Sequence, residues 1–377
     1  MKTRYFSLNA LLLPLLFLLG CKATETGNTA TKESVIGYQD ERIAYMGRIN
    51  RHDPEAAELY WSGTSIKANF DGTGIQALLK DEKGDNYYNV IIDGDSITLL
   101  QPDTTATYYT LAAGLPDGRH TVELFKRTEY DRGKAWFYGF RTSPGTTLLP
   151  ASAPKNREIE FYGNSISAGY AIDDYSGKDS PAGTHTNNYL SYAALTARHF
   201  NAAYSCVCKS GIGIMISWFP YTMPEIYDRL NPLDSTSTWD FTAYTPDVVV
   251  INLFQNDSWI VKRPEHAEFK RVFGTTAPTE EAIVEAYRKF VLTIREKYPK
   301  AHIIAALGSM DITQEGSPWP GYVEKAVASL HDDKVYTHFM PYKNTPGHPR
   351  VEEQQAMAES LIRFIEAKTE WEGGPTN

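Results

Sequence analysis

The sequence predicts two domains, an N-terminal β-sandwich followed by a three-layer α/β/α domain with a five-stranded parallel sheet. Residues 36–150 show short alternating runs of apolar and polar residues separated by turn sequences, with no long helical period. Such short strands favour a sandwich. From residue 158 onward, apolar strands alternate with amphipathic helices, which favours a parallel, doubly wound sheet. A chain of 377 residues is long enough to give each domain its own core.

The first 20 residues have the pattern of a secretion signal. A positively charged start precedes the apolar run Leu11–Leu19, which is too short to span a bilayer. The run ends in Leu-Leu-Gly before Cys21, and this ending resembles a bacterial lipoprotein signal. We therefore expect a signal peptide at 1–20, lipid on the sulfur of Cys21 and a polar tether at 21–35. The expected location is the bacterial cell envelope, anchored by lipid to the outer membrane on its periplasmic or its surface face. The alternative is an ordinary cleaved secretion signal.

The first folded domain is assigned to residues 36–150. Its clearest predicted strands are at 88–92, 120–125 and 135–140, where apolar and polar side chains alternate. Turns that contain Asp-Gly and Lys-Gly separate the strands of this region. A segment that begins with Pro-Gly at 144 and ends with Pro154 is predicted to link this domain to the next.

The second domain is assigned to residues 155–370. Its predicted strands are at 158–162, 203–209, 247–253, 301–307 and 334–339. The third and fourth are nearly continuous apolar runs, as expected for parallel strands buried on both faces. Two helices stand out between and after them, at 279–298 and 351–368, because each has apolar residues on one face. Thr279 is a candidate N-cap for the first of these helices.

The composition and the cysteines argue against two classes of site. The net charge is −9 and no basic run follows the first residues, so nucleic acid is not an expected partner. Cys206 and Cys208 occupy adjacent same-face positions of one predicted strand, which fits a disulfide poorly. No further metal ligands are evident nearby. We interpret both cysteines as small core residues.

Polar or glycine-containing turns follow four of the five predicted parallel strands. They contain Ser165, Gly211, Asn256 and His348, in this order. Because the carboxyl ends of parallel strands meet at one edge of the sheet, we expect these residues to converge there. A nucleophilic hydroxyl, a glycine amide open to close approach, a carboxamide donor and an imidazole are the groups that acyl transfer requires.

These turns resemble the sequence blocks of the SGNH (GDSL-type) hydrolase superfamily. Gly163-Asn164-Ser165 resembles its nucleophile block, and Ser210-Gly211 its glycine block. Asn256-Asp257 and His348-Pro349 resemble its asparagine and histidine blocks. One block alone is weak support, whereas four in the family's order are specific.

The N-terminal domain resembles the jelly roll that precedes the catalytic domain in carbohydrate esterase family 2, the family of acetyl xylan esterase-like proteins. The matching residues include Gly47-Arg48, Trp61-Ser62-Gly63, and Lys126-Arg127-Thr128-Glu129. The resemblance covers roughly residues 45–368. It implies a serine esterase that removes O-acetyl groups from polysaccharides or oligosaccharides such as xylan or glucomannan, with no metal or cofactor. The front domain would bind glycan or support the site, and we favour support.

The resemblance also implies a role for each residue of the four blocks. Ser165 would attack the ester carbonyl while His348 takes its proton. The backbone N–H groups of Ser165 and Gly211 and the side chain of Asn256 would form the oxyanion hole. Trp218 and Trp259, which lie just past two of the blocks, either stack on a sugar or pack in the core.

Three positions depart from the family pattern. Asn164 replaces an aspartate before the nucleophile, and Phe254 replaces a glycine two residues before Asn256. Thr345 stands where the aspartate that orients the histidine is expected. We therefore expect a Ser–His dyad, with the imidazole N–H donated to a backbone carbonyl within 345–347. Asp257 is a conceivable surrogate, but its motif neighbours indicate a structural role.

Two alternatives remain open at this stage. One keeps the chemistry and changes the acyl substrate to O-acetylated cell-wall glycan or lipid. The other is a surface carbohydrate-binding lipoprotein whose hydrolase domain is inactive, which the three departures motivate. Retention of Ser165, Asn256 and His348 argues against the inactive form.

Overall fold

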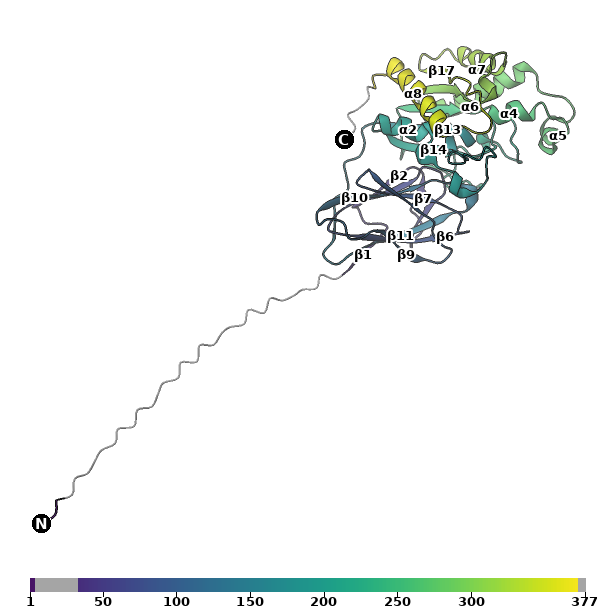
Figure 1. Cartoon of the computed structure of the whole chain (residues 1–377). Coiled ribbons are helices and arrows are strands. Elements are labelled where there is room, and N and C mark those ends of the chain that lie inside the picture. The colour runs from purple at the N-terminus through teal and green to yellow at the C-terminus, as the bar shows by residue number, and fades with distance from the viewer. Residues whose placement is uncertain (4–32, 372–377) are drawn as a thin grey trace. The chain divides into compact units, whose positions relative to one another are not determined.

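The computed structural model describes residues 1–3 and 33–371 (Figure 1). Most of the predicted signal peptide, the lipid-attachment residue Cys21 and most of the tether lie outside the described residues, so they stay predictions. Residues 33–371 belong to one compact unit. Within these described ranges, no helix combines the length and the apolar character needed to cross a bilayer.

The first domain is a sandwich of two antiparallel six-stranded sheets, seen as two layers in Figure 1. One sheet has the order β3 (Ile49–Asn50), β4 (Ala57–Leu59), β11 (Ala135–Thr142), β6 (Ile75–Asp81), β9 (Thr107–Ala112), with β1 (Ser34–Gly37) also paired to β11. The other has the order β12 (Thr147–Leu149), β5 (Ser65–Asp71), β10 (Arg119–Lys126), β7 (Tyr88–Ile92), β8 (Ser96–Leu100), with β2 (Ile43–Met46) also paired to β5. The three strands singled out from the alternating pattern are β7, β10 and β11.

The sandwich core forms because alternate side chains of facing strands point inward. In β6 every second residue is buried, as the period of a half-exposed strand requires. Its Leu79 packs in one cluster with Phe70, Leu124 and Phe137 from three other strands. A short 3-10 helix, η1 (Tyr130–Arg132), lies in the connection from β10 to β11.

The second domain contains the predicted five-stranded parallel sheet. Its order is β14 (Ala203–Cys208), β13 (Glu158–Gly163), β15 (Val248–Asn252), β16 (His302–Leu307), β17 (Val335–Phe339). Each strand agrees with its predicted bounds to within one residue, because buried apolar runs bounded by polar turns mark strands clearly. The change in strand order on either side of β13 places the ends of β13, β14 and β15 next to one another.

Helices cover both faces of this sheet (Figure 1). On one face, α2 (Tyr192–His199) and α8 (Val351–Lys368) pack on Phe161 and Val250. On the other, α6 (Glu280–Lys297) and α7 (Trp319–Ala328) pack on Val249 and Ile251. Neighbouring residues of a strand point to opposite faces, so one apolar strand serves both layers. The three-layer α/β/α architecture is therefore confirmed.

The remaining helical elements are short and lie in the loops. They are α1 (Ser165–Ala168), η2 (Gly183–His185), η3 (Asn188–Leu190), α3 (Met223–Ile226), α4 (Gln255–Ile260), α5 (Ala267–Phe273) and η4 (Asp311–Thr313). The predicted cap of α6 is confirmed, since the side chain of Thr279 accepts a hydrogen bond from Ala282 N. Cys206 and Cys208 are buried with free thiols, which confirms them as core residues.

A buried ion pair joins the two domains. The guanidinium of Arg48, from the sandwich, lies 3.0 Å from a carboxylate oxygen of Glu160 on β13, and both side chains are fully buried. Glu160 also accepts hydrogen bonds from the hydroxyls of Tyr162, Ser205 and Tyr298. Because the charges are paired and hydrogen-bonded, they are tolerated inside the protein and fix β13 against the sandwich.

Candidate active site

Ser165 is presented by the turn that leaves β13. It is the first residue of the short helix α1 and is 7% exposed. Asn164 caps this helix, because its side-chain oxygen accepts a hydrogen bond from Ile166 N at 3.0 Å. The asparagine thus retains the capping role open to the family's aspartate. Its side-chain Nδ2 is buried and finds no hydrogen-bond partner among the described residues.

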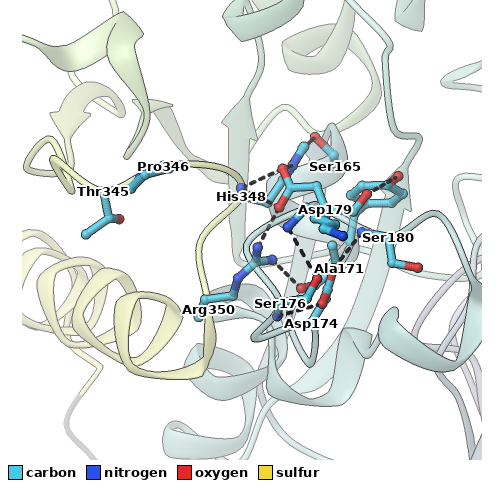
Figure 2. Close-up of polar contacts among 12 residues, drawn as sticks. Ser165, Ala171, Asp174, Ser176, Asp179, Ser180, Thr345, Pro346, His348 and Arg350 are labelled. Atoms are coloured by element: carbon cyan, nitrogen blue, oxygen red, sulfur yellow. Dashed lines mark hydrogen bonds and ion pairs between the residues drawn. The ribbon is translucent and has the colours of Figure 1, made fainter.

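The structure brings Ser165 and His348 together from distant parts of the sequence (Figure 2). His348 precedes α8, and its Nε2 lies 2.8 Å from the Ser165 Oγ. The imidazole also contacts the ring of Tyr170 edge to face, with the ring centroids 4.9 Å apart. This hydrogen-bonded pair is the geometry expected of a nucleophile and its general base.

The prediction that a backbone carbonyl orients the imidazole is wrong, and with it the prediction of a dyad. The Nδ1 of His348 lies 2.6 Å from Oδ2 of Asp179, a carboxylate from the loop after α1 (Figure 2). The backbone N–H of His348 donates to the same carboxylate, at 2.9 Å to Oδ2 and 3.1 Å to Oδ1. The described residues therefore assemble a Ser–His–Asp chain in which Asp179 takes the third position.

Two of the three carbonyls expected to hold the imidazole accept hydrogen bonds from another residue. Lys343 Nζ donates to Thr345 O at 2.8 Å and to Pro346 O at 3.2 Å. It also lies 2.7 Å from the Thr345 hydroxyl, which in turn contacts Glu353. Figure 2 shows Thr345 and Pro346 away from Asp179. The residue at the family's aspartate position thus belongs to a polar cluster with Lys343 and Glu353 and does not contact the imidazole.

Asp179 is held in place by its own loop and by α8. Its backbone has a left-handed φ of +52°, uncommon outside glycine. Arg350 Nη2 lies 2.6 Å from Oδ1 of Asp179, and Tyr170 donates to the Asp179 carbonyl at 3.3 Å. The carboxylate of Asp174 closes the preceding turn by accepting the backbone N–H groups of Ser176 and Ser180 (Figure 2).

The charge of Asp179 suits this position. Burial acts to raise the pKa of Asp179, but the hydrogen bond and charge of His348, followed by Arg350, outweigh it and hold the pKa well below its usual range. The carboxylate is therefore ionised at neutral pH. An ionised acceptor at Nδ1 places the imidazole proton on Nδ1 and leaves Nε2 free to accept the Ser165 hydroxyl proton.

Sequence reasoning missed Asp179 because no fixed spacing marks it. Its segment, 173–180, is rich in Asp, Ser and Gly and resembles an ordinary surface loop. The available signal was indirect: the lack of an aspartate at position 345 together with a polar loop after the nucleophile. Asp173, in the same loop, instead pairs with Arg127 at 2.7 Å.

Gly211 lies beside the nucleophile turn, at the edge of the sheet where the carboxyl ends of the parallel strands were expected to meet. β14 and β13 pair in parallel, and Lys209 N donates to Gly163 O at 3.2 Å. Gly211 has a φ of +85°, and a Cβ there would lie 3.3 Å from the Trp218 ring. Neither the Gly211 N–H nor the Ser165 N–H donates to an acceptor in the described part of the chain. Both are thus free to donate to a ligand.

Asn256 occupies the second position of α4, after β15. Its Oδ1 accepts the indole N–H of Trp218 at 3.0 Å, and its Nδ2 donates to Ile212 O at 2.8 Å. A carboxamide nitrogen carries two hydrogens, so one remains for a further acceptor. Hydrogen bonds at both the oxygen and the nitrogen therefore fix the orientation of the Asn256 side-chain amide.

Phe254 keeps the backbone conformation for which the family's glycine is suited. Its φ is +78°, and its ring packs against Tyr287 and Trp319 at centroid distances of 4.9 and 5.0 Å. A left-handed conformation costs a non-glycine residue about 1–2 kcal/mol. The buried aromatic contacts offset this cost, so the turn into α4 is preserved.

Asp257 has a structural role, as its motif neighbours indicated. It is fully buried and accepts the backbone N–H groups of Ile214, Met215 and Ile216 at 2.7–3.1 Å. Burial raises the pKa of Asp257 to about 6 although these hydrogen bonds act to lower it. The carboxylate therefore shapes the loop after Gly211.

Both tryptophans are half-buried, and Trp259 lies three residues after Asn256 in α4. Trp218 donates to Asn256, and the guanidinium of Arg263 lies 5.1 Å from its ring centroid. Trp259 donates to both carboxylate oxygens of Asp311, at 2.9 and 3.0 Å. Both indoles are fixed by their N–H groups, and stacking on a sugar stays a prediction. Across residues 1–3 and 33–371, no cluster of His, Cys, Asp or Glu is arranged to hold a metal ion.

Known proteins resemble this chain along most of its length. The sequence model of the family described as Carbohydrate esterase 2 N-terminal matches residues 45–152. The cellulase/esterase CelE of Acetivibrio thermocellus is 32% identical over 351 residues, which cover 87% of this chain and 40% of CelE. The chain therefore spans less than half of that relative. An acetylxylan esterase/glucomannan deacetylase of Cellvibrio japonicus is 26% identical over 375 residues, covering 96% of this chain and 99% of that protein.

A solved structure also resembles this chain, and the resemblance extends over both domains. The family two carbohydrate esterase from Clostridium thermocellum, determined in complex with cellohexaose, is 33% identical and has a TM-score of 0.78. The match covers 88% of this chain and 100% of that one, and so includes the sandwich and the parallel-sheet domain. The chain belongs to carbohydrate esterase family 2, a family of carboxylic ester hydrolases.

Proposed function

We propose that this chain is a serine esterase that removes O-acetyl groups from polysaccharides or oligosaccharides, with acetylated xylan and glucomannan as the substrate class. The observation that carries the proposal is the chain of contacts from Ser165 Oγ to His348 Nε2, 2.8 Å, and from His348 Nδ1 to Asp179, 2.6 Å. Family membership and the names of the relatives support the acetyl group and the glycan.

The first step forms an acetyl-enzyme. Ser165 Oγ attacks the ester carbonyl while His348 Nε2 takes its proton, and Asp179 stabilises the resulting imidazolium. The tetrahedral intermediate collapses, the bond to the sugar oxygen breaks, and His348 returns the proton to that oxygen. The sugar hydroxyl leaves, and the acetyl group remains on Ser165.

The second step releases acetate. Water attacks the acetyl-enzyme while His348 takes one of its protons, and collapse of the second intermediate returns that proton to Ser165 Oγ. In both steps the negative oxygen accepts hydrogen bonds from Ser165 N–H, Gly211 N–H and the free N–H of Asn256. Each such donor is worth about 3 kcal/mol in comparable sites.

The sugar-binding part of the proposal rests on the aromatic residues near the site. Trp218 and Trp259 are half-buried beside Asn256, and ring faces of this kind bind the apolar faces of sugars. The complex of the C. thermocellum relative with cellohexaose supports a β-linked glycan as ligand. The assembled Ser–His–Asp chain argues against the inactive binding protein.

We test the activity by acetate release from a chain that lacks residues 1–21. Acetylated xylan, acetylated glucomannan and 4-nitrophenyl acetate are the substrates, and Ser165→Ala is the control. Serine-dependent release from a polysaccharide supports the proposal. Release from the aryl acetate alone favours another acyl substrate, and glycan binding without any release favours the inactive form. Full activity of Ser165→Ala contradicts the mechanism.

We also propose that the chain is held at a membrane of the bacterial cell envelope by lipid on Cys21. The sequence pattern before Cys21 is the support, and stable anchoring of this kind requires more than one acyl chain. The test compares the wild type with Cys21→Ser in membrane and soluble fractions of the producing cell. Loss of the membrane fraction in Cys21→Ser is expected, and equal partition of both proteins contradicts lipid anchoring.

A further inference from the structure

The connection from β10 to β11, residues 127–134, reaches from the sandwich to two loops of the candidate active site. The backbone at the start of this connection is fixed by Lys126, the last residue of β10. The fully buried Lys126 donates through Nζ to Thr128 O at 2.6 Å and to Glu129 O at 3.3 Å. A backbone held at this point can present the following side chains in defined directions. Several of them contact the second domain, and Glu129 and Arg127 do so at the two loops named above.

Glu129 binds the residue that precedes Gly211. One carboxylate oxygen lies 2.5 Å from Ser210 N and the other lies 2.5 Å from Ser210 Oγ. The side chain is 5% exposed, so these bonds are made away from bulk water. Lys209 Nζ lies 3.7 Å from Glu129 and 2.8 Å from Asp131, which balances part of the negative charge.

This contact restricts the direction of the Gly211 N–H. The peptide bond between Ser210 and Gly211 is planar, so an anchored Ser210 limits where the next N–H points. On the far side of Gly211, its carbonyl accepts a hydrogen bond from Trp218 N at 3.1 Å. Gly211 is therefore held on both sides. Glu129 holds Ser210 before it, and the loop that Asp257 shapes holds its carbonyl.

A carboxylate is an unexpected residue near a site where negative charge develops. Its field opposes an oxyanion, whereas a neutral side chain would not. A geometric role explains its presence, because a carboxylate is an acceptor at both oxygens and can receive the N–H and the O–H of Ser210 together. In glutamine one of these oxygens becomes an NH2 group, so the Ser210 hydroxyl would have to accept from it instead of donating. The neutral amide oxygen would also bind the Ser210 N–H less strongly than a carboxylate does.

Arg127 holds the opposite side of the site in the same way. Its Nη2 donates to Asp173 at 2.7 Å and to Thr184 O at 2.9 Å, and its Nε donates to Thr186 O at 3.1 Å. These partners bracket the loop that carries Asp179. One connection of the sandwich thus contacts both the segment with the glycine amide and the loop with the third member of the Ser–His–Asp chain.

We infer that Glu129 is a positioning residue for the oxyanion hole, through which the sandwich domain supports catalysis without contacting substrate. The inference rests on the proposed function, because it takes the Gly211 N–H as an oxyanion donor. The sandwich domain would thus support the site through the contact of Glu129 with Ser210, and the step affected is stabilisation of the oxyanion.

The experiment compares Glu129→Gln with Glu58→Gln in the otherwise unchanged full chain. Glu58 is also a buried sandwich carboxylate, and it bonds Asn50, Tyr60 and Lys134 within its own domain. We expect Glu129→Gln to lower kcat on 4-nitrophenyl acetate roughly 10- to 100-fold, with KM within about twofold. Binding of phenylboronic acid, which forms a tetrahedral adduct on serine, should weaken in parallel. Glu58→Gln should leave kcat and boronate affinity unchanged, whatever its effect on Tm.

A second variant keeps the test decisive if Glu129→Gln does not fold. Ser210→Ala removes one of the two bonds without burying a new polar group, and we expect kcat to fall by roughly threefold to tenfold at unchanged KM. If Glu129→Gln does fold, the double variant Glu129→Gln/Ser210→Ala should lower kcat by less than the product of the two single reductions, because both changes act on the same contact. Glu129→Asp should recover part of the kcat, because it restores the carboxylate one methylene short of its partner.

Two outcomes overturn the inference. One is a folded Glu129→Gln or Ser210→Ala with wild-type kcat and boronate affinity. The other is an equal loss in Glu129→Gln and Glu58→Gln that follows Tm, which indicates a stability effect alone. Ser165→Ala separates these outcomes from failure of the proposed function. If Ser165→Ala retains activity, the nucleophile is misassigned and the proposed function fails, whatever the Glu129 variants show.

Discussion

Gly347 and Asp179 are packed so closely that a Cβ on Gly347 would lie 2.6 Å from the Asp179 Oδ1. Gly347 also has a left-handed φ of +71°, which turns the backbone N–H of His348 onto the same carboxylate. The glycine before the histidine is thus needed twice, for its conformation and for its missing side chain. This contact explains how a carboxylate from the loop after α1 takes the third position of the Ser–His–Asp chain.

The first prediction concerns this contact. Gly347→Ala should push Asp179 from the imidazole and lower kcat roughly 10- to 100-fold, with a smaller change in KM. Gly316→Ala is the matched control. Gly316 also has a positive φ, but apart from its two chain neighbours no described residue has an atom within 4 Å of a Cβ placed there. Steady-state kinetics on 4-nitrophenyl acetate distinguish the two. Equal kinetics in both variants would show that the close packing has no catalytic consequence.

The second prediction is that Asp179→Asn lowers kcat roughly 10²- to 10⁴-fold, because the amide neither stabilises the imidazolium nor fixes the Nδ1 tautomer. Adding Thr345→Asp to this variant should restore nothing, since Thr345 faces Lys343 and Glu353. Asp240→Asn, at an exposed carboxylate that bonds Thr242, is the control. A near-normal kcat in Asp179→Asn would show that Ser165 and His348 act as a dyad without Asp179.

The third prediction is a pH dependence of stability. Burial acts to raise the pKa of Asp179, but His348 and Arg350 lower it overall. A carboxyl whose folded pKa lies below its unfolded pKa, about 3.9, contributes stability above that value, and this stability is lost as the pH falls through the folded pKa. The difference in unfolding free energy between wild type and Asp179→Asn should therefore be larger at pH 5 than at pH 3. Urea unfolding at both values measures it, and a difference that grows toward pH 3 contradicts the sign.

The elements of the fold were predictable because each is encoded locally. Buried apolar runs gave the five parallel strands, and the apolar face of 351–368 gave the bounds of α8. The convergence of Ser165, Gly211 and Asn256 at one edge was also predictable, because it requires only that they follow the carboxyl ends of parallel strands.

The missed features depend on contacts between segments far apart in sequence. Asp179 has a left-handed backbone in a loop without periodicity, and its direction depends on Arg350 from the start of α8. Glu129 meets Ser210 across the two domains. No residue spacing encodes such pairs. The family resemblance pointed instead to position 345, where other members carry the aspartate that orients the histidine and this chain carries Thr345.

The fourth prediction tests the buried pair between the domains. Arg48→Met or Glu160→Gln alone should destabilise the protein by roughly 3–5 kcal/mol, because each leaves its partner's charge buried without an opposite charge. The double variant should lose less than the sum of the two. Arg271→Ala, which breaks an exposed pair with Glu268, should change stability by less than about 1 kcal/mol. Denaturant unfolding gives the values, and additive losses at Arg48 and Glu160 would show that the two charges are not coupled.

The fifth prediction separates the two interpretations of Trp218. Trp218→Phe removes the indole N–H that fixes the Asn256 amide but retains an aromatic ring. If the tryptophan positions Asn256, kcat should fall roughly tenfold on both 4-nitrophenyl acetate and acetylated xylan. If it stacks on sugar, KM for the polysaccharide should rise while the aryl acetate is hydrolysed normally, because that substrate has no sugar ring. We expect the first result, since Trp218 donates directly to the amide and one of its faces meets Arg263. Trp259→Phe is the matched control, because its N–H serves Asp311 and not Asn256.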